Sequence, residues 1–520
     1  MVFRVIITFL LLLAMNQKAA SQVLEPIRME LPARIDVPTY QKILLGEKGV
    51  MLFYESTEFD DKGKRKWYFN LYDTAFSELW LQHIGIADGY ALHSSIKTAD
   101  HVLFLFTAID GKKNAQSGYE LIRFDIGNGH FQLLSGQLPD KAKISGFASV
   151  HQFALIGVNL PKFQSDLLLY DLDRLSVTSL PHLIAGQSVI QAIEADHEKQ
   201  RFMIGFKRFE SNKFIEEVFQ TYNELGQQQS SVSYTLPPFY LHSYKMMFDQ
   251  NGKLLVAGSF DNSETRRNTA REAAEQNELS FESKGLFFIQ LSSSGVEIQR
   301  FHPFDSFTNI YKAMSTDDLM RVRQRQSRKG ENKSDIDITF QFYNPRLIPM
   351  GDKYIYAAEA FKPQYRVETR MDYDFYGRMV PFTYTIFEGF NYFSVLLAGF
   401  DSEGSLLWSN DLELRDMLLP YLQRIVEVKP DGNDLVVAYV KEGMLTSKII
   451  DSNGIEVGQT EQSRIENLFT NDRLLEENFS EINYWYDHFF LVNGYQRISN
   501  NRLRSDNSRK ILYLQKVAFE

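Results

Sequence analysis

Short runs of apolar and aromatic residues, bounded by Gly, Asp, Asn or Pro, recur along the chain at intervals of about fifty residues. One series of such runs comprises residues 50–54, 102–107, 153–158, 201–206, 253–257, 354–358, 435–440 and 488–492. Another strand-like segment precedes each run, and two more follow it. Four antiparallel strands repeated at this spacing are typical of the blades of a β-propeller.

Several of the repeated units share one turn, which opens with Asp, Asn or Ser and ends with Gly. It occurs at 223–226, 292–295, 401–404 and 451–454. The first side chain accepts a backbone hydrogen bond, and Gly adopts the positive φ that closes a tight hairpin. Two unrelated β-sandwiches would also contain short strands, but they do not repeat one strand–turn–strand pattern. We therefore predict an all-β fold, a single β-propeller of seven or eight four-stranded blades.

The ends of the chain predict how the ring closes. The last unit has strands in 484–496 and 510–518, but no outer strand follows them. Residues 23–31 alternate apolar and polar side chains and end before Pro32. We predict that this segment supplies the missing outer strand. Closure would remove exposed sheet edges, and a ring that grows by repetition accounts for 520 residues, a length beyond the usual limit of one packed core.

Residues 1–21 have the pattern of a secretory signal peptide. Arg4 precedes an apolar run at 5–15, and small residues stand at 19–21. The run is too short to cross a bilayer, although a buried amphipathic helix would be an alternative interpretation. The prediction is an exported protein, periplasmic or extracellular and soluble after cleavage, with 22–520 as the propeller domain. The absence of cysteine fits a bacterial envelope better than a disulfide-rich secretome.

The acidic composition limits the class of partner. The net charge is −10, and it becomes −12 when the signal segment with Arg4 and Lys18 is removed. Such a chain lacks the positive field of a nucleic-acid-binding protein. A local exception is the basic run at 321–329, which could seat an anionic polymer or form the charged face of a helix. We predict no nucleic-acid partner and no transmembrane segment.

The long insertions of the repeat, at about 259–285, 305–339 and 361–391, fall on one face of the predicted ring. The first two contain segments predicted to be helical, 262–277 and 315–329, because they are polar and rich in helix-forming residues. Loops displayed from a rigid scaffold are common binding sites. The alternative explanation is that the loops lengthened on this face by evolutionary drift, because nothing constrains their length there.

The insertion at 361–391 is dense in aromatic residues placed among charged ones. Aromatic rings beside carboxylates and guanidinium groups can stack on sugars or clamp a peptide. The candidate ligand-binding residues are Tyr373, Tyr376, Phe382, Tyr384, Arg370 and Arg378. The alternative is that this segment folds back as an extra hairpin and buries its rings over the mouth of the ring.

Catalytic motifs are absent from the sequence. No G-x-S-x-G or H-E-x-x-H occurs, and no cysteine is available as a nucleophile or metal ligand. Asp372 and Glu388 are weak candidates for the carboxylate pair of a glycosidase, which needs a separation of about 5–10 Å. We predict no metal site and no cofactor.

The segment D-S-E-G-S-L-L-W at 401–408 resembles the D-x-x-G-x-x-L-W turn of quinoprotein-like propeller repeats, and 73–80 is a degenerate second copy. The resemblance covers two turns and supports the fold without implying a quinone cofactor. As a whole, the chain resembles exported β-propeller proteins of Gram-negative bacteria.

These observations favour a non-enzymatic propeller that binds a protein partner or a polymer such as a glycan through its insertion-bearing face. One alternative is a carbohydrate-active or other hydrolytic enzyme with carboxylates near the central channel. Another is a structural component of the cell envelope. The sequence does not predict an oligomeric state.

Overall fold

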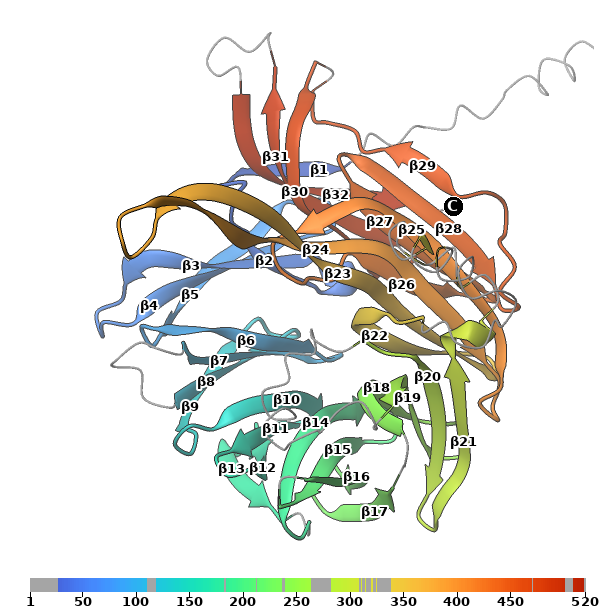
Figure 1. The fold of residues 1–520 in the computed structure, drawn as a ribbon. Helices are drawn as coiled ribbons and strands as arrows, with labels where there is room; N and C mark the ends of the chain where they lie inside the picture. Colours follow the sequence, from blue (N-terminus) through green and yellow to red (C-terminus); the bar gives the residue numbers. More distant parts are fainter. Residues whose placement is uncertain are drawn as a thin grey trace, which may run out of the picture.

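Strands make up most of this computed structural model, which describes residues 27–109, 118–181, 184–211, 213–235, 239–262, 282–307, 310, 314, 319–320, 324, 338–469, 471–500 and 508–518. In these residues, 32 strands form eight antiparallel sheets of four strands each. The sheets follow one another around a ring (Figure 1). The prediction of an all-β propeller is confirmed, and the number of blades is eight.

The first four blades are built from strands that follow one another in the chain. Blade 1 contains β2 (Gln41–Leu44), β3 (Val50–Phe59), β4 (Arg65–Tyr72) and β5 (Glu78–Ile86), with the short helical turn η1 (Gly46–Lys48). Blade 2 contains β6 (Tyr90–Lys97), β7 (His101–Ala108), β8 (Gly118–Asp125) and β9 (Phe131–Gln137). Blade 3 contains β10 (Lys143–Val150), β11 (Phe153–Leu160), β12 (Gln164–Asp171) and β13 (Ser176–Leu180). Blade 4 contains β14 (Gln187–Asp196), β15 (Arg201–Glu210), β16 (Lys213–Asn223) and β17 (Gln228–Tyr234).

The last four blades keep this order until the chain ends. Blade 5 contains β18 (Phe239–Phe248), β19 (Leu254–Asn262), β20 (Gly285–Ser292) and β21 (Gly295–Pro303), followed by η4 (Phe304–Ser306). Blade 6 contains β22 (Gln341–Met350), β23 (Lys353–Tyr373), β24 (Met379–Phe400) and β25 (Leu406–Leu419). Blade 7 contains β26 (Val426–Asp431), β27 (Asp434–Lys441), β28 (Met444–Asp451) and β29 (Glu461–Arg464). Blade 8 contains β30 (Arg473–Tyr486), β31 (Phe489–Ser499), β32 (Ser508–Ala518) and, from the other end of the chain, β1 (Arg28–Pro32).

The strand β1 closes the ring as the sequence predicts. It pairs with β32 in an antiparallel register that runs from Arg28 opposite Gln515 to Pro32 opposite Ile511. It is therefore the outermost strand of blade 8. The alternation in the amino-terminal segment indicated this pairing, although the described strand begins later than the predicted 23–31.

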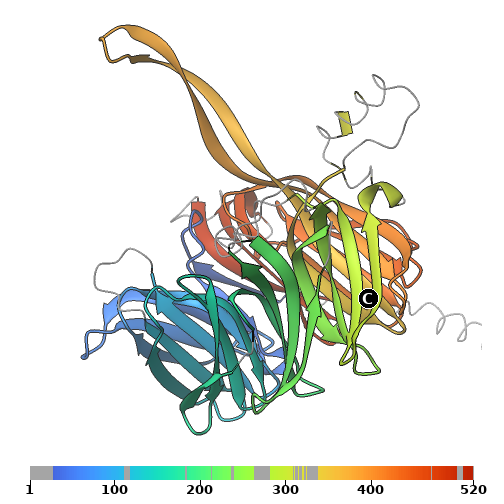
Figure 2. The ribbon, with the colours of Figure 1, turned by 60° about the horizontal axis from the view of Figure 1, so that its bottom comes forward.

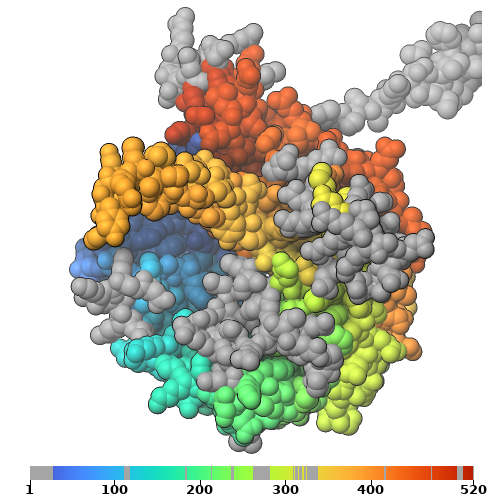
Figure 3. All heavy atoms as spheres, in the orientation of Figure 1, coloured from blue at the N-terminus to red at the C-terminus, as the bar shows by residue number. Residues whose placement is uncertain are grey.

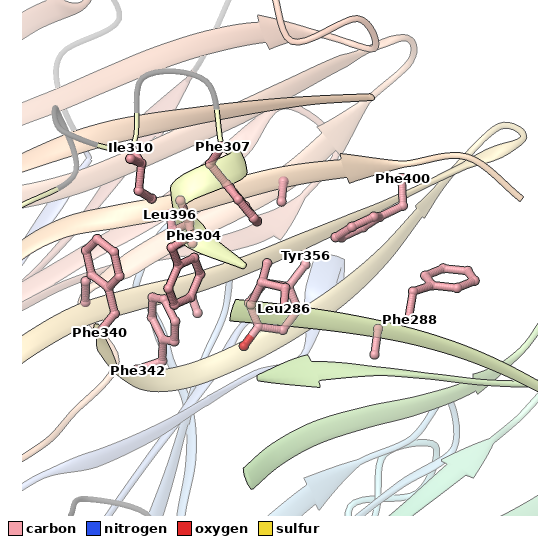
Figure 4. Packing of buried hydrophobic residues seen from close by; sticks show 14 of the residues in the cluster. Leu286, Phe288, Phe304, Phe307, Ile310, Phe340, Phe342, Tyr356, Leu396 and Phe400 are labelled. Atoms are coloured by element: carbon pink, nitrogen blue, oxygen red, sulfur yellow. The ribbon is translucent and has the colours of Figure 1, made fainter. Parts of the chain in front are cut away.

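The hydrophobic core is divided among the interfaces between neighbouring blades. In the cluster between blades 5 and 6, Phe288 and Leu286 of β20 face Tyr356 of β23 and Phe400 of β24 (Figure 4). The second strands are deeply buried, as in β7, where six consecutive residues from His101 to Phe106 are inaccessible. Because both faces of such strands pack against other blades, they are continuous apolar runs rather than alternating ones.

The repeated turn forms as predicted and also joins neighbouring blades. The Asp401 carboxylate accepts hydrogen bonds from the backbone N–H of Glu403 (2.9 Å) and Ser405 (2.7 Å). In the next blade, Gly454 has a φ of +79°, and a Cβ there would come within 2.4 Å of the Trp408 ring. Trp408 Nε1 donates to the carbonyl of Ser452 at 3.1 Å. The tryptophan thus packs against the turn of the following blade, while the quinoprotein-like resemblance itself stays a prediction.

The predicted insertions are described only in part. The structure describes residues 259–262 and 282–285 of the first insertion, so the predicted helix at 262–277 lies almost wholly outside the described residues. Within 315–329 only residues 319, 320 and 324 are described. The predicted signal peptide also lies outside the described residues. Among those described, no helix is long and apolar enough to cross a membrane.

Candidate functional site

The insertion at 361–391 forms a long two-stranded hairpin. We call its residues 362–389, where β23 and β24 extend beyond blade 6, the arm. The arm extends away from the ring in Figure 2 and lies over part of the visible face in Figure 3. The alternative interpretation, a hairpin that buries its rings over the mouth of the ring, is right about the hairpin but wrong about the burial: Phe375 is 97% exposed, Tyr376 77% and Tyr373 67%. Nothing in the described ring covers them, because the hairpin leaves the surface instead of folding back.

The ligand-binding residues predicted on the arm do not converge. Tyr373 lies on one face of the ribbon, whereas Arg370, Phe382 and Tyr384 lie on the other, since side chains alternate along each strand. Tyr376 and Arg378 belong to the turn at the tip. Ion pairs already occupy the two guanidinium groups, Arg370 with Glu368 at 2.6 Å and Arg378 with Asp374 at 3.1 Å.

The two candidate catalytic carboxylates are also held apart. Asp372 lies opposite Val380, near the tip, and accepts a hydrogen bond from the Tyr384 hydroxyl at 3.2 Å. This contact raises the pKa of Tyr384. Glu388 lies near the root of the arm, 3.3 Å from Arg366. At about 3.3 Å per strand residue the two are roughly 25 Å apart. The structure therefore does not form the glycosidase pair that the sequence suggested.

A concave site exists elsewhere, at the seam where the last blade meets the first. This pocket, the seam pocket, has a volume of about 350 Å³. Its walls come from β2 and β3 of blade 1, from β30, β31 and β32 of blade 8, and from residues 421–423 before blade 7. Blades 1 and 8 are the adjacent blue and red sheets of Figure 1. The site therefore exists because the two ends of the chain close the ring.

Aromatic rings form much of the wall of the seam pocket. Tyr421 and Phe479 stack with their centroids 5.6 Å apart, and Phe479 meets Tyr495 edge-on at 5.9 Å. The Tyr495 hydroxyl donates to the Tyr40 carbonyl (3.2 Å) and accepts from the Tyr40 N–H (2.9 Å). These contacts hold the first residues of blade 1 against blade 8.

The walls of the seam pocket also carry an ion pair and two partly buried tyrosine hydroxyl groups. Lys42 Nζ donates to the Glu481 carboxylate, which is an ion pair between blades 1 and 8. Burial raises the pKa of Tyr421 to about 12, and the negative charge of Glu481 adds to the shift. Burial likewise raises the pKa of Tyr495. Both hydroxyl groups are therefore protonated and uncharged.

Two side-chain amide atoms of the seam pocket have no hydrogen-bond partner among the residues that the structure describes. The Asn493 Oδ1 atom is a buried acceptor, and the whole residue is only 7% exposed. The Gln423 Nε2 atom is a buried donor. An unsatisfied buried polar group costs about 1–3 kcal/mol.

The root of the arm positions one wall of the pocket. Tyr392, buried beside the arm on β24, donates from its hydroxyl to the Gln423 carbonyl at 2.9 Å and accepts from the Gln423 N–H at 3.1 Å. The segment that carries Gln423 and Tyr421 is thereby fixed to blade 6. Because connections between blades and the turns between second and third strands share one face of a propeller, the pocket and the arm lie on the same side.

Sequence reasoning missed the seam pocket. Its residues are spread over 38–52, 421–423, 479–495 and 512–514, and none of these segments contains a recognisable motif. The signal that could have found it is the predicted closure itself, which brings the segment after residue 32 next to the last blade. The aromatic density of 361–391 directed attention to the arm instead.

No family model matches the chain, and no curated protein matches it. Among solved structures, the β-propeller domain of the Trilobed protease from Pyrococcus furiosus is 8% identical with a TM-score of 0.35, and the match covers 81% of this chain and 98% of that one. A prolyl endopeptidase is 9% identical, with a TM-score of 0.36 and coverage of 90% and 54%. Prolyl oligopeptidase B from Galerina marginata is 8% identical, with a TM-score of 0.38 and coverage of 88% and 56%.

These similarities concern the arrangement of the chain alone. The chain spans about half the length of the two prolyl peptidases. The three structures named above come from peptidases, so the sequence-based prediction of a non-enzymatic propeller that binds a protein partner or a polymer through its insertion-bearing face is not upheld. What the described residues establish is an eight-bladed β-propeller with a pocket at its seam.

Proposed function

We propose that the seam pocket binds a short peptide segment. The observation that carries the proposal is that Asn493 and Gln423 both line the seam pocket and each has one side-chain amide atom, Oδ1 and Nε2 respectively, without a partner among the described residues. A peptide group offers an N–H and a C=O, and thus complements an unpaired acceptor and an unpaired donor.

The remaining walls suit the rest of a peptide. The stacked rings of Tyr421 and Phe479 provide an apolar surface for a side chain, and the Lys42–Glu481 pair provides both signs of charge at the rim. The pocket volume of about 350 Å³ is at the lower end of the range for small-ligand sites, roughly 300–1,000 Å³. We therefore expect one residue and its flanking peptide groups to occupy it.

We further infer that the chain acts outside the cytoplasm of a bacterium, because residues 1–21 have the pattern of a signal peptide and the sequence contains no cysteine.

Isothermal titration calorimetry with N-acetylated amino-acid amides tests the proposal. These probes carry two peptide groups and one side chain, and we expect phenylalanine and leucine derivatives to bind. The Asn493→Leu substitution should weaken binding by about tenfold or more, the equivalent of losing one good hydrogen bond. It should leave the melting temperature unchanged or raise it, because it removes an unsatisfied buried atom.

Ser145→Ala is the matched control. Ser145 also carries a buried oxygen without a partner, but it lies in blade 3 and does not line the pocket. The control should bind the amides as the unsubstituted chain does. No binding by any amide, or equal binding by the Asn493→Leu chain, would overturn the proposal.

A further inference from the structure

One face of the arm is uncharged along its whole length. Directly opposite residues of an antiparallel ladder share a face. One face therefore carries Tyr365, Val367, Thr369, Met371, Tyr373, Met379, Pro381, Thr383, Thr385 and Phe387. All ten are exposed, and none is charged. We call this set the neutral face.

The charged residues of the arm lie on the opposite side. Arg366, Glu368, Arg370 and Asp372 of β23 alternate with the neutral residues, and the ion pairs Arg366–Glu368 (2.9 Å) and Arg370–Glu368 (2.6 Å) connect them. The opposite side also carries Val380, Phe382, Tyr384 and Ile386, so the two faces differ in charge: one holds four charged side chains and the other holds none. An exposed, uncharged surface of this extent marks an interaction site.

We propose that the neutral face is a self-association surface, on which the arm of a second copy of this chain packs face to face. The whole chain has a net charge of −10, so two copies repel each other wherever charged surfaces meet. This repulsion is weakest between two surfaces that carry no charge. On the neutral face two copies meet without bringing any charge into contact. Four basic and four acidic residues in 362–389 leave the arm as a whole without net charge.

The available area is close to what a stable dimer requires. An aromatic side chain has about 150–250 Å² to bury, and Tyr365, Tyr373 and Phe387 expose roughly half of theirs. With the two methionines, Val367, the threonines and the proline, the neutral face offers on the order of 700 Å² per copy, against about 800 Å² per partner in a standard interface. Packing of a face against its own copy gives a two-fold axis, the commonest symmetry of soluble oligomers.

Two other occupants fit less well. Strand addition at the edges of the ribbon is disfavoured, since Pro363 and Pro381 remove backbone donors from its two strands. An anionic bilayer attracts clusters of Lys and Arg, and the neutral face has neither. The proposal does not depend on which ligand the seam pocket binds.

The full-length chain is tested by sedimentation equilibrium at concentrations up to about 100 µM. We expect a monomer–dimer equilibrium. Met371→Glu places a charge on the neutral face, one residue pair from its centre, and should raise the dimer dissociation constant at least about tenfold. Phe382→Glu is the matched control: it adds the same charge at the same height of the arm but on the opposite face, and it should leave the equilibrium unchanged.

The absence of cysteine from the chain permits a second, independent measurement. A single Thr369→Cys lies at the centre of the neutral face, close to the expected two-fold axis. Copper–phenanthroline should oxidise two such thiols, one from each copy, to an intermolecular disulfide with loss of two protons and two electrons. The neighbouring Arg370→Cys, which points to the other face, should cross-link far less.

The outcomes are distinct. A chain that is monomeric throughout the concentration range, or that cross-links equally through both cysteines, overturns the proposal. A monomeric chain that floats with phosphatidylcholine vesicles would assign the neutral face to a bilayer and would also overturn it. Failure of amide binding in the seam pocket would leave the dimer unaffected, so the two proposals can fail separately.

Discussion

At the residue scale, two side chains that can carry charge are completely buried in blade 4: Lys207 of β15 and Glu217 of β16. Lys207 Nζ lies 3.8 Å from a Glu217 oxygen and donates to the Leu241 carbonyl at 2.7 Å. It also lies 3.7 Å from the centroid of the Tyr240 ring. Burial lowers the pKa of Lys207 to about 8 and raises the pKa of Glu217 to about 7, because it penalises the charged form of each.

These shifts predict a pH dependence of stability relative to a Lys207→Met/Glu217→Gln double variant. Between pH 4.5 and 7 the folded state retains the Glu217 proton that the unfolded state has lost, so the unsubstituted chain loses stability as the pH rises. Between pH 8 and 10.5 the folded state lacks the Lys207 proton that the unfolded state holds, so stability is regained. The relative free energy of unfolding should pass through a minimum near pH 7–8.

Urea denaturation of both chains between pH 5 and 10 measures this difference. Each limb amounts to roughly 3 kcal/mol at most, since one unit of pKa shift corresponds to about 1.4 kcal/mol. A difference that does not change with pH would show that the pair titrates at ordinary values and would contradict the prediction.

At the element scale, the arm is a continuation of the second and third strands of blade 6. Its root is buried: Phe361 and Tyr392 pack in the interface with blade 7. Beyond the root, the ribbon is held by its own ladder and by surface ion pairs, which contribute little to stability. The arm therefore depends on the propeller, whereas the propeller gains almost nothing from the arm.

Removal of the arm should accordingly leave the ring intact. Replacing residues 366–386 by Asn-Gly joins Tyr365 to its partner Phe387 through a two-residue turn. We expect the melting temperature, followed by circular dichroism, to stay within about 2 °C, because no buried contact of the ring is removed. A large drop would mean that the arm stabilises the ring.

At the scale of the whole molecule, the ring is held closed by a polar cluster around β1. The Arg28 guanidinium is buried over the Tyr513 ring at 4.4 Å and donates to the Gln496 side chain at 2.8 Å. It also pairs with Glu30 at 3.0 Å. Arg509 of β32 reaches Glu30 at 2.9 Å and also pairs with Asp472, at the start of blade 8. The ends of the chain are thus joined by backbone pairing and by buried charges.

Breaking this cluster should destabilise the entire ring. Arg28→Ala removes the donor to the buried Gln496 side-chain oxygen and leaves Glu30 with Arg509 alone, and we expect it to cost about 1–3 kcal/mol. A chain lacking residues 22–33 should lose more, since β32 becomes an exposed edge. Thermal unfolding measures both effects.

Arg464→Ala provides the control for that experiment. Arg464 belongs to β29, which is also a short outermost strand, but every residue of β29 is exposed. Its substitution should change the melting temperature by no more than a degree or two. Equal effects of Arg28→Ala and Arg464→Ala would contradict the role of β1 as the closing strand.

Much of the architecture could be predicted because it is a local and repeated property. Apolar runs such as 102–107 must be buried on both faces, and turns such as 401–404 close hairpins through interactions between neighbours in sequence. Repetition of one unit then leaves few possible arrangements. Even the closing strand could be predicted, since β32 needs a partner and the alternating segment before Pro32 fits it.

The candidate site could not be predicted in the same way. Asn493 and Gln423 are 70 residues apart, and nothing in their neighbourhoods distinguishes them from other strand and loop amides. They share a pocket because ring closure and the Tyr392 contact bring blades 6, 8 and 1 together. On the arm, alternation could reveal two faces, but whether the rings are covered depends on where the hairpin points after it leaves blade 6.

The sequence by itself determined the repeat, the turns and the need for closure, because each follows from burial patterns and hydrogen bonds within about fifty residues. Only the tertiary structure decided that the aromatic insertion is exposed and that the pocket lies at the seam. Both depend on contacts between segments far apart in the chain, and the free energy of such contacts is not encoded in any single segment.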